Sequence, residues 1–197
     1  MAGTEAVSPG ARAFVGVGTN IRPEESVFGA LELLERHSGI WIVGISTFYR
    51  TTALPAPGAP PSIGDEAPDY LNGVLELRTG LNHGELAGAL ENVEAALGRV
   101  RTAEKYAPRT MDLDLLLFFP SSRPEVSLQD SPSSTPPPHS EIRSRAFVAI
   151  PLLELAPDLL LPPDQTPLGE VAAAFPGPVG QPEGLLTERL RDRFLRQ

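Results

Sequence analysis

The sequence predicts an α+β fold, in which helices pack on a mainly antiparallel sheet. Three observations lead to this prediction. Short apolar strand segments alternate with segments of helical period, two strand segments follow one another between residues 40 and 77, and 41% of the 197 residues are apolar. That apolar fraction is enough to bury a core in a single domain, and strands separated by helices favour a sandwich of helices on a sheet.

The first half of the chain gives the clearest element signals. Residues 13–18 form a short apolar strand segment that ends at glycine. Pro23 suits the first position of a helix, acidic residues fill the turn that follows it, and Gly39 suits the helix end. Apolar residues recur in between at helical spacing. We then expect strands over residues 40–51 and 70–77.

The second half repeats the alternation. Asn82 and Glu85 have the spacing of a capping box, which predicts a helix that ends at Gly98. Residues 110–119 are strongly apolar and predict a strand. Residues 144–155 predict another helix.

Prolines mark the breaks between these elements. Of the 22 prolines, five lie between residues 55 and 68 and six between residues 120 and 138. Proline fixes φ and removes a hydrogen-bond donor, so both stretches are expected to be loops inserted between structured segments.

The proposed extent of the domain follows from these signals. We expect a single domain over residues 12–163 and a C-terminal extension of unknown role over residues 164–197. Within the extension, weak helical patterns lie near residues 168–175 and 185–195.

Composition excludes several classes of protein. The 25 acidic and 16 basic residues give a net charge of −9, which disfavours a nucleic-acid or membrane-surface binder. The absence of cysteine excludes disulfides, thiolate metal sites and cysteine catalysis. No apolar run reaches the roughly 18 residues of a membrane span, and the first residues lack the features of a signal peptide. We expect a cytoplasmic protein with no membrane partner.

Two aspartates stand out in the apolar strand at 110–119. Side chains alternate across a strand, so Asp112 and Asp114 are expected on one face with residues 116 and 118, while residues 111, 113, 115 and 117 take the other. Two positions along a strand are about 6.5–7 Å apart. Such a pair could hold two magnesium ions together with phosphate oxygens. The motif is short, and a solvated strand end is the alternative.

Cations flank the aspartates on a chain that is otherwise acidic. Upstream lie Arg99, Arg101, Lys105 and Arg109, and downstream two arginines follow His139. Cations beside metal-binding carboxylates suit a polyphosphate, although a solvated basic loop is the alternative. The sequence has no G-x-x-x-x-G-K-[ST] loop, and the glycine pair at 16 and 18 lacks the third glycine of a dinucleotide fingerprint.

These residues resemble a known family. The string P-R-T-M-D-L-D at 108–114, preceded by G-R-V-R at 98–101, closely resembles the signature of the 6-hydroxymethyl-7,8-dihydropterin pyrophosphokinases. Further similar segments occur in the same order as in the family, at residues 14–20, 46–51, 68–72, 139–147 and 151–158.

The resemblance implies an enzyme of folate biosynthesis. Such an enzyme transfers the β,γ-pyrophosphoryl group of ATP to the hydroxymethyl oxygen of the dihydropterin and releases AMP. It also implies a ferredoxin-like sandwich, ATP as co-substrate and two magnesium ions. A monomer is expected as well, without a sequence feature to argue it.

The resemblance further assigns individual roles. The metal ligands would be Asp112 and Asp114. The catalytic residues would be Arg99, Arg109, Asp112 and Asp114. The ATP-binding residues would be Glu94, Arg101, Arg109, His139 and Arg145. The pterin pocket would be formed by Thr51, Leu54, Tyr70, Asn72, Tyr106 and Phe147.

The chain departs from the family pattern at a few positions. Tyr106 stands where many members have tryptophan, Ser140 where many have tyrosine, and Thr102 where a further basic residue is common. Thr52 and Ala53 replace a pair of prolines. Because the aspartates and arginines are intact, we expect altered affinity rather than lost chemistry.

Two other functions compete with this interpretation. A non-catalytic ferredoxin-like module that binds a small molecule would not require the two aspartates on one face beside cations. A two-metal nuclease would use the same aspartates, but the net charge of −9 argues against it.

Overall fold

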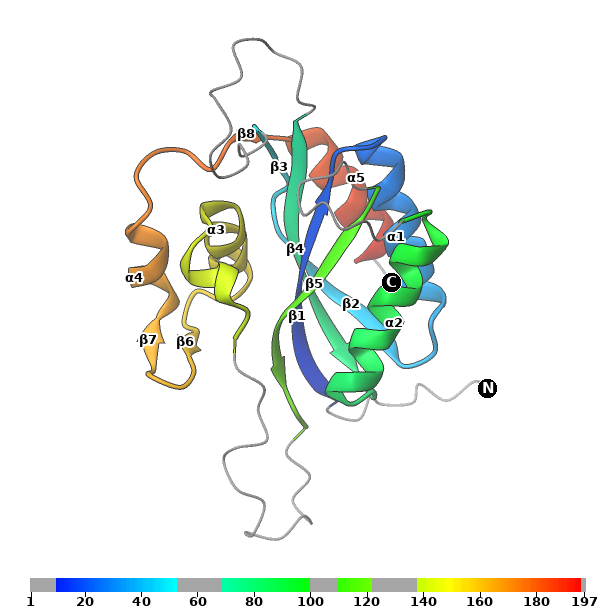
Figure 1. The fold of residues 1–197 in the computed structure, drawn as a ribbon, viewed down its shortest axis with the longest axis horizontal. Coiled ribbons are helices and arrows are strands. Elements are labelled where there is room, and N and C mark those ends of the chain that lie inside the picture. Colours follow the sequence, from blue (N-terminus) through cyan, green and yellow to red (C-terminus); the bar gives the residue numbers. More distant parts are fainter. Residues whose placement is uncertain (1–9, 53–68, 100–109, 122–137, 196–197) are drawn as a thin grey trace, which may run out of the picture.

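The structure is a computed structural model that describes residues 10–52, 69–99, 110–121 and 138–195. A twisted antiparallel sheet runs through its centre, and helices cover both faces (Figure 1). The prediction of an α+β fold with helices on an antiparallel sheet is confirmed.

The sheet has six strands in the order β5-β1-β4-β3-β8, with β2 also paired to β4. All of these pairs are antiparallel. The strands are β1 (Ala11–Thr19), β2 (Ile40–Ile45), β3 (Tyr49–Thr51), β4 (Tyr70–Thr79), β5 (Asp112–Phe119) and β8 (Gln181–Pro182). The long strands β1 and β4 pair along their whole length and form the centre of the sheet.

One face of the sheet is covered by α1 (Pro23–Arg36), α2 (His83–Ala96) and α5 (Gly184–Phe194). Helix α1 begins at Pro23, as predicted. The capping box of α2 is also present, because the Asn82 side chain accepts from the Glu85 N–H at 3.0 Å and the Glu85 carboxylate accepts from the Asn82 N–H at 2.8 Å. These helices enclose the larger core, which includes Val15, Leu34, Leu90, Leu113 and Leu190.

The other face carries a smaller layer. The 3-10 helix η2 (Ser140–Arg143), α3 (Ala146–Leu155) and α4 (Leu168–Ala173) lie there with the hairpin of β6 (Leu160–Leu161) and β7 (Thr166–Pro167). They enclose the smaller core, which includes Phe14, Val74, Leu116, Leu152 and Leu168. The helix expected over 144–155 therefore begins two residues later, at Ala146, and the weak pattern near 168–175 forms a short helix.

The prediction of one strand over residues 40–51 is wrong in its middle. Strand β2 ends at Ile45, and Ser46, Thr47 and Phe48 belong to neither strand before β3 begins at Tyr49. Their backbone N–H groups bond to distant partners, Ser46 to the Val74 carbonyl, Thr47 to the Glu154 carboxylate and Phe48 to the Thr187 hydroxyl. The bonds of Thr47 and Phe48 to partners outside β4 interrupt the pairing and divide the segment into two strands.

The predicted face assignment in β5 holds for Asp112 and Asp114 but is wrong at its end. Phe14 lies opposite Leu117, whereas Val15 lies opposite Leu115, so Leu116 is an extra residue in β5. Such a bulge reverses the alternation that follows it. Phe118 therefore joins the larger core with Leu113, and Leu117 joins the smaller core.

None of the helices within the described ranges has the length and hydropathy that crossing a membrane requires.

Candidate active site

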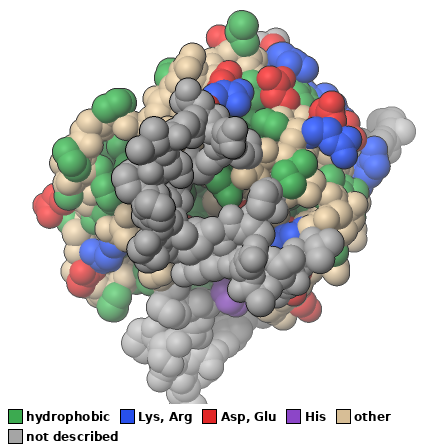
Figure 2. Space-filling model, turned by 45° about the horizontal axis from the view of Figure 1, so that its top comes forward, with side chains coloured by type: hydrophobic (Ala, Val, Ile, Leu, Met, Phe, Trp, Pro, Cys, Tyr) green, Lys and Arg blue, Asp and Glu red, His purple; other side chains and the backbone are tan. Residues whose placement is uncertain are grey.

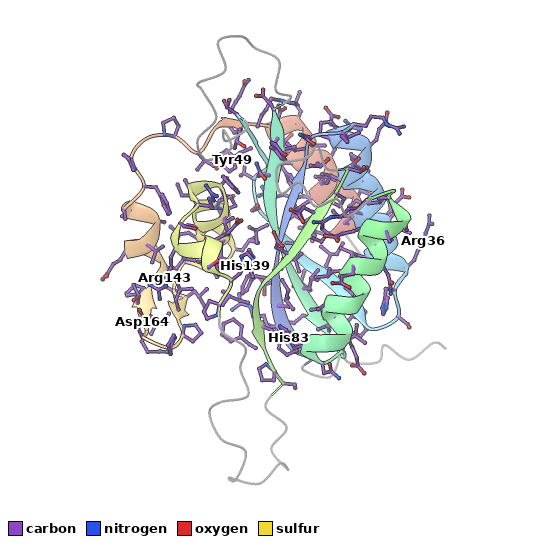
Figure 3. The ribbon with its side chains drawn as sticks, in the orientation of Figure 1. Arg36, Tyr49, His83, His139, Arg143 and Asp164 are labelled. Atoms are coloured by element: carbon purple, nitrogen blue, oxygen red, sulfur yellow. The ribbon has the colours of Figure 1, made fainter. Side chains whose placement is uncertain are left out.

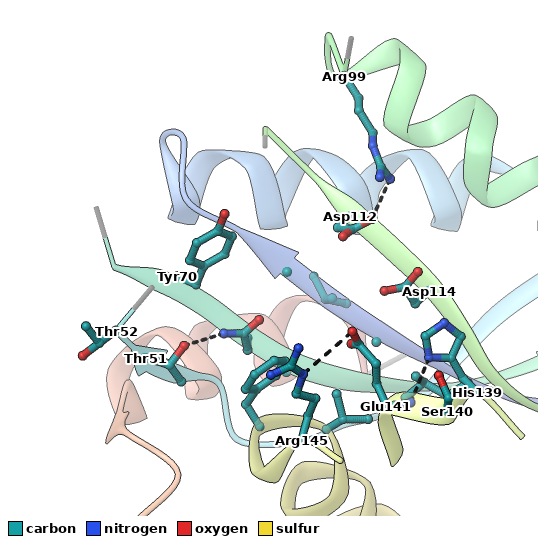
Figure 4. A pocket seen from close by; sticks show the side chains of 18 residues that line it. Thr51, Thr52, Tyr70, Arg99, Asp112, Asp114, His139, Ser140, Glu141 and Arg145 are labelled. Atoms are coloured by element: carbon teal, nitrogen blue, oxygen red, sulfur yellow. Dashed lines mark hydrogen bonds and ion pairs between the residues drawn. The ribbon is translucent and has the colours of Figure 1, made fainter. Parts of the chain in front are cut away.

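A pocket of about 450 Å³ opens between the sheet and the η2–α3 layer. Its walls come from β1, the end of β3, β4 and β5 on the sheet side and from η2 and α3 on the other (Figure 4). Figure 2 shows the molecule with its upper end turned forward, where acidic and basic side chains intermingle at the upper right.

The floor of the pocket is made by two glycines of β1. Gly16 lies opposite Asp114 and Gly18 lies opposite Asp112 in the β1–β5 ladder. A Cβ on Gly18 would come within 3.2 Å of the Asn72 side-chain oxygen, and one on Gly16 within 3.4 Å of Leu116. The absence of side chains at these two positions leaves the space beside the carboxylates open.

Asp112 and Asp114 both line this pocket, as the strand alternation predicts. Burial and, to a smaller extent, the negative charge of Asp112 together raise the pKa of Asp114 to about 6. The charge of Asp112 thus opposes the ionisation of Asp114, and a cation between or beside the two carboxylates would relieve that repulsion.

Arg99 joins this cluster from the end of α2. Its guanidinium lies 2.6 Å from the Asp112 carboxylate and also pairs with Glu94. Glu94 is 4% exposed and accepts from the Leu113 N–H at 2.7 Å. Burial raises the pKa of Glu94, although the Leu113 N–H and Arg99 oppose that shift. Glu94 therefore ties Arg99 to the strand that carries the aspartates.

The η2 side contributes His139, Glu141 and Arg145. The His139 N–H donates to the Leu116 carbonyl at 2.9 Å, which fixes this segment beside β5. Figure 3 shows His139 between the sheet and the α3 layer, whereas His83 lies at the far end of α2. The Arg145 guanidinium lies 3.9 Å from the Glu141 carboxylate, and both line the pocket.

The opposite end of the pocket is less charged. The Asn72 side-chain N–H donates to the Thr51 hydroxyl at 2.8 Å, so its carbonyl oxygen lies toward Gly18 and the pocket. Tyr70, Thr52 and Phe147 complete this end. An amide beside aromatic rings is suited to a flat ligand with amide-like edges.

The donor set fits magnesium. Asp112 and Asp114 supply oxygen ligands, and Mg²⁺ binds through one or two carboxylates with waters and phosphate oxygens in the remaining positions. Within the described residues, no group of three or more His, Cys, Asp and Glu side chains could hold a metal ion.

The structure brings together most of the residues that the sequence predicted. Those that line the pocket are Thr51, Tyr70, Asn72, Arg99, Asp112, Asp114, His139, Arg145 and Phe147. Glu94 is among the predicted ATP contacts, but its carboxylate faces Arg99 and the backbone of β5. The predictions for Leu54, Arg101, Tyr106 and Arg109 fall outside the described residues.

Sequence reasoning missed three kinds of lining residue. Gly16 and Gly18 were considered only as a nucleotide-loop motif, although their spacing of two places both on one face of a strand. Glu141 stands four residues before Arg145, a spacing that brings side chains together on a helical turn. Thr52 was considered only as one of two residues that replace a pair of prolines in the pocket wall, and it was not among the predicted site residues.

The model of the 7,8-dihydro-6-hydroxymethylpterin-pyrophosphokinase (HPPK) family matches residues 14–157. That range contains every described residue that lines the pocket. This chain belongs to the HPPK family.

Comparison with individual relatives supports the same family assignment. The chain is 38% identical over 167 residues to the 2-amino-4-hydroxy-6-hydroxymethyldihydropteridine pyrophosphokinase of Pseudomonas aeruginosa, which covers 84% of this chain and 92% of that protein. The protein of the same name from Synechocystis is 36% identical over 151 residues, 76% of this chain and 69% of that protein. The folic acid synthesis protein fol1 of Schizosaccharomyces pombe is 32% identical over 165 residues, 83% of this chain but 20% of the longer protein.

Proposed function

We propose that this chain transfers the β,γ-pyrophosphoryl group of ATP to the hydroxymethyl oxygen of 6-hydroxymethyl-7,8-dihydropterin, with release of AMP, in tetrahydrofolate biosynthesis. The observation that carries the proposal is the pairing of Asp112 and Asp114 at one end of a pocket whose other end presents Tyr70 and Thr51, the partner of Asn72 (Figure 4). The charged end suits a polyphosphate and the other end suits a pterin, so one cavity can hold both substrates with their reacting groups adjacent.

The phosphate end of the site would work through charge. Asp112 and Asp114 would hold Mg²⁺, which on binding neutralises phosphate charge as the bond between the α- and β-phosphates breaks. Among the described residues, the arginines that line the pocket are Arg99 and Arg145, and each pairs with a carboxylate in this structure. Each can exchange its carboxylate for a phosphate oxygen, which is also a charge-assisted partner. Arg101 and Arg109 are proposed to add to this set.

The pterin end would work through shape and hydrogen bonding. Thr51 fixes the orientation of the Asn72 amide, whose carbonyl oxygen can then accept from the pterin ring edge. Phe147 offers an aromatic face, and Tyr106 is proposed to stack on the other side of the ring, with Leu54 beside it. His139 lies near Asp114 at the junction with the nucleotide end, in keeping with a contact to ATP. For Glu94 we propose that any contribution to ATP binding passes through Arg99.

We also propose that the fold is a ferredoxin-like sandwich with the two proline-rich stretches as loop insertions. The order β1, α1, the β2–β3 segment, β4, α2 and β5 supports this topology. The domain limits of 12–163, a monomeric state and a cytoplasmic location stay predictions.

The alternatives are less well supported. A non-catalytic binding module gives no reason to place two carboxylates and two arginines around one open floor. A nuclease would require a basic surface for its substrate, and the net charge is −9.

The test is product identity. The protein is incubated with Mg-ATP, with and without the hydroxymethyl dihydropterin, and the nucleotides are separated. We expect AMP, formed only when the pterin is present. ADP as the sole product, or AMP formed at the same rate without the pterin, would overturn the proposed function.

A further inference from the structure

The last part of the chain lies beyond the family match yet touches the wall of the pocket. The match ends at residue 157, while strand β8 and helix α5 occupy residues 181–194. Figure 1 shows β8 beside β3 at the upper end of the sheet and α5 next to α1. Helix α5 also places Leu186, Leu190 and Phe194 in the larger core.

Strand β3 is only three residues long and is held between two neighbours. On one edge it pairs with β4, and on the other Tyr49 and Arg50 pair with β8. Gly180 lies so close that a Cβ there would fall 2.3 Å from the Arg50 carbonyl oxygen. The Glu183 carboxylate accepts from the Arg50 guanidinium at 2.7 Å. Without these residues, β3 would be a short exposed edge strand.

The residue that precedes β3 is held by the same segment. The Phe48 N–H donates to the Thr187 hydroxyl at 3.0 Å, and the Phe48 carbonyl accepts from the Glu183 N–H at 2.8 Å. Thr187 is 2% exposed, and its hydroxyl donates to the Glu183 carbonyl at 2.9 Å. Both backbone groups of the fully buried Phe48 thus bond to residues near the C-terminus.

These contacts lead directly to the proposed pterin end of the pocket. The Phe48 ring lies against Gly73, where a Cβ would come within 2.9 Å of ring carbons, and Gly73 lines the pocket. At the other end of β3, Thr51 accepts from Asn72, and Thr52 lines the pocket. A shift of β3 would therefore move Thr51 and Thr52 and release the Asn72 amide.

We propose that Gly180, Glu183 and Thr187, which we call the C-terminal clamp, are positioning residues that set the pterin wall of the pocket by fixing β3. This inference rests on the proposed function, because it assumes that Thr51, Thr52 and Asn72 face the pterin. Within the described residues, the hydrogen bonds and the ion pair of the clamp join it to Phe48 and Arg50 and not to Arg99, Asp112, Asp114 or Arg145, so we expect its loss to affect the pterin and not ATP.

The first test is a pair of glycine substitutions in one segment. Gly180→Ala forces β8 away from the Arg50 carbonyl, whereas Gly184→Ala adds a methyl group with nothing within 4 Å. We expect Gly180→Ala to raise the KM for the pterin about tenfold, as for loss of one well-made hydrogen bond to the substrate. The KM for ATP should stay within twofold, and Gly184→Ala should match the parent in both constants.

The second test removes one hydroxyl. Thr187→Val keeps the shape but leaves the buried Phe48 N–H without its partner, whereas Thr187→Ser keeps the hydroxyl. We expect the valine variant to raise the KM for the pterin alone, and the serine variant to restore it to near the parent value. If Thr187→Val does not fold, the glycine pair decides the question.

The outcomes distinguish a failure of the proposed function from a failure of the proposal for the C-terminal clamp. If the parent protein forms no pterin-dependent AMP, the proposed function fails. If the parent is active but Gly180→Ala and Thr187→Val only lower Tm or kcat, with the KM for the pterin unchanged, the clamp is purely structural and the inference is overturned. Equal increases in both KM values would also contradict it.

Discussion

Strands β1 and β5 differ between their two faces, because one face packs in the larger core and the other lines the pocket. On β1, Val15 and Val17 are buried in the larger core, while the residues between and after them, Gly16 and Gly18, form the pocket floor. On β5, Leu113 packs in the larger core between two pocket aspartates. We call these the packed face and the pocket face. One strand therefore contributes stability on one side and an open, charged surface on the other.

The difference between the two faces explains how the fold remains stable although it contains an open, charged pocket. The pocket face buries like charges and omits side chains, both of which weaken a fold. The packed face offsets that cost with large apolar side chains from α1, α2 and α5. Substitutions on the pocket face should therefore change activity, and those on the packed face should change stability.

The largest effect is expected for the aspartates. Asp112→Asn and Asp114→Asn each remove a proposed ligand of the cation that would stabilise the transferring phosphates. Loss of one electrostatic stabiliser of a transition state costs about 3–4 kcal/mol, so the rate should fall by a factor of hundreds. Single-turnover AMP release measures it.

Thermal unfolding of the same two variants without magnesium is the control. We expect no loss of stability for Asp114→Asn, because a repulsive charge has been removed. For Asp112→Asn we expect little net change, because the loss of the ion pair with Arg99 offsets the relief of repulsion. A variant that turned over within a few-fold of the parent would rule out the metal assignment, and one that unfolded many degrees earlier would make the aspartate structural.

On the packed face, Leu31→Ala should have the opposite signature. Leu31 is fully buried in the larger core, and truncation of such a leucine costs about 2–5 kcal/mol of unfolding free energy. Denaturant titration measures this loss. The folded fraction should keep the KM values of the parent, and a large change in either one would show that the two faces are coupled.

A smaller effect concerns pH. Asp114 has a pKa raised to about 6 in the folded protein, so its neutral form is favoured there. The stabilising effect of holding this proton in the folded state is fully present below pH 4. It is lost as the pH rises through 6, where the buried carboxyl ionises. Asp114→Asn should therefore stabilise the metal-free protein by up to about 3 kcal/mol at pH 7 and by almost nothing at pH 4. Unfolding curves at both pH values measure the difference, and an equal effect at both would contradict it.

The smallest effect compares two glycines. Gly18→Ala would place a methyl group 3.2 Å from the Asn72 oxygen, whereas Gly88→Ala in α2 meets nothing within 4 Å. We expect Gly88→Ala to stabilise the fold by about 0.5–1 kcal/mol with unchanged kinetics. Gly18→Ala should raise the KM for the pterin several-fold, since the new methyl occupies the pocket. Steady-state kinetics and Tm for both variants measure this, and identical kinetics would show that the floor is not in contact with substrate.

The parts of the fold that the sequence predicted have local causes. Pro23 starts α1, and Asn82 with Glu85 starts α2, because each signal lies within one helical turn of the element it begins. The aspartate pair was predictable for the same reason, since a spacing of two residues suffices to place both side chains on one face of a strand.

The parts that the sequence did not predict depend on distant contacts. The break after Ile45 is fixed by Val74, Glu154 and Thr187, which lie up to 139 residues away. The bulge at Leu116 is visible only in its pairing with β1. The role of Glu94 behind Arg99 likewise follows from packing of α2 on β5, and no pattern within α2 indicates it.

The most direct test of the proposed reaction follows one phosphorus atom. With ATP labelled with ³²P in the β-phosphate, a single turnover in the presence of magnesium and the hydroxymethyl dihydropterin should place the label in the pterin product and leave unlabelled AMP. Label retained in ADP would mean that only the γ-phosphoryl group moves. Label released as inorganic pyrophosphate would mean hydrolysis, and either result would contradict pyrophosphoryl transfer.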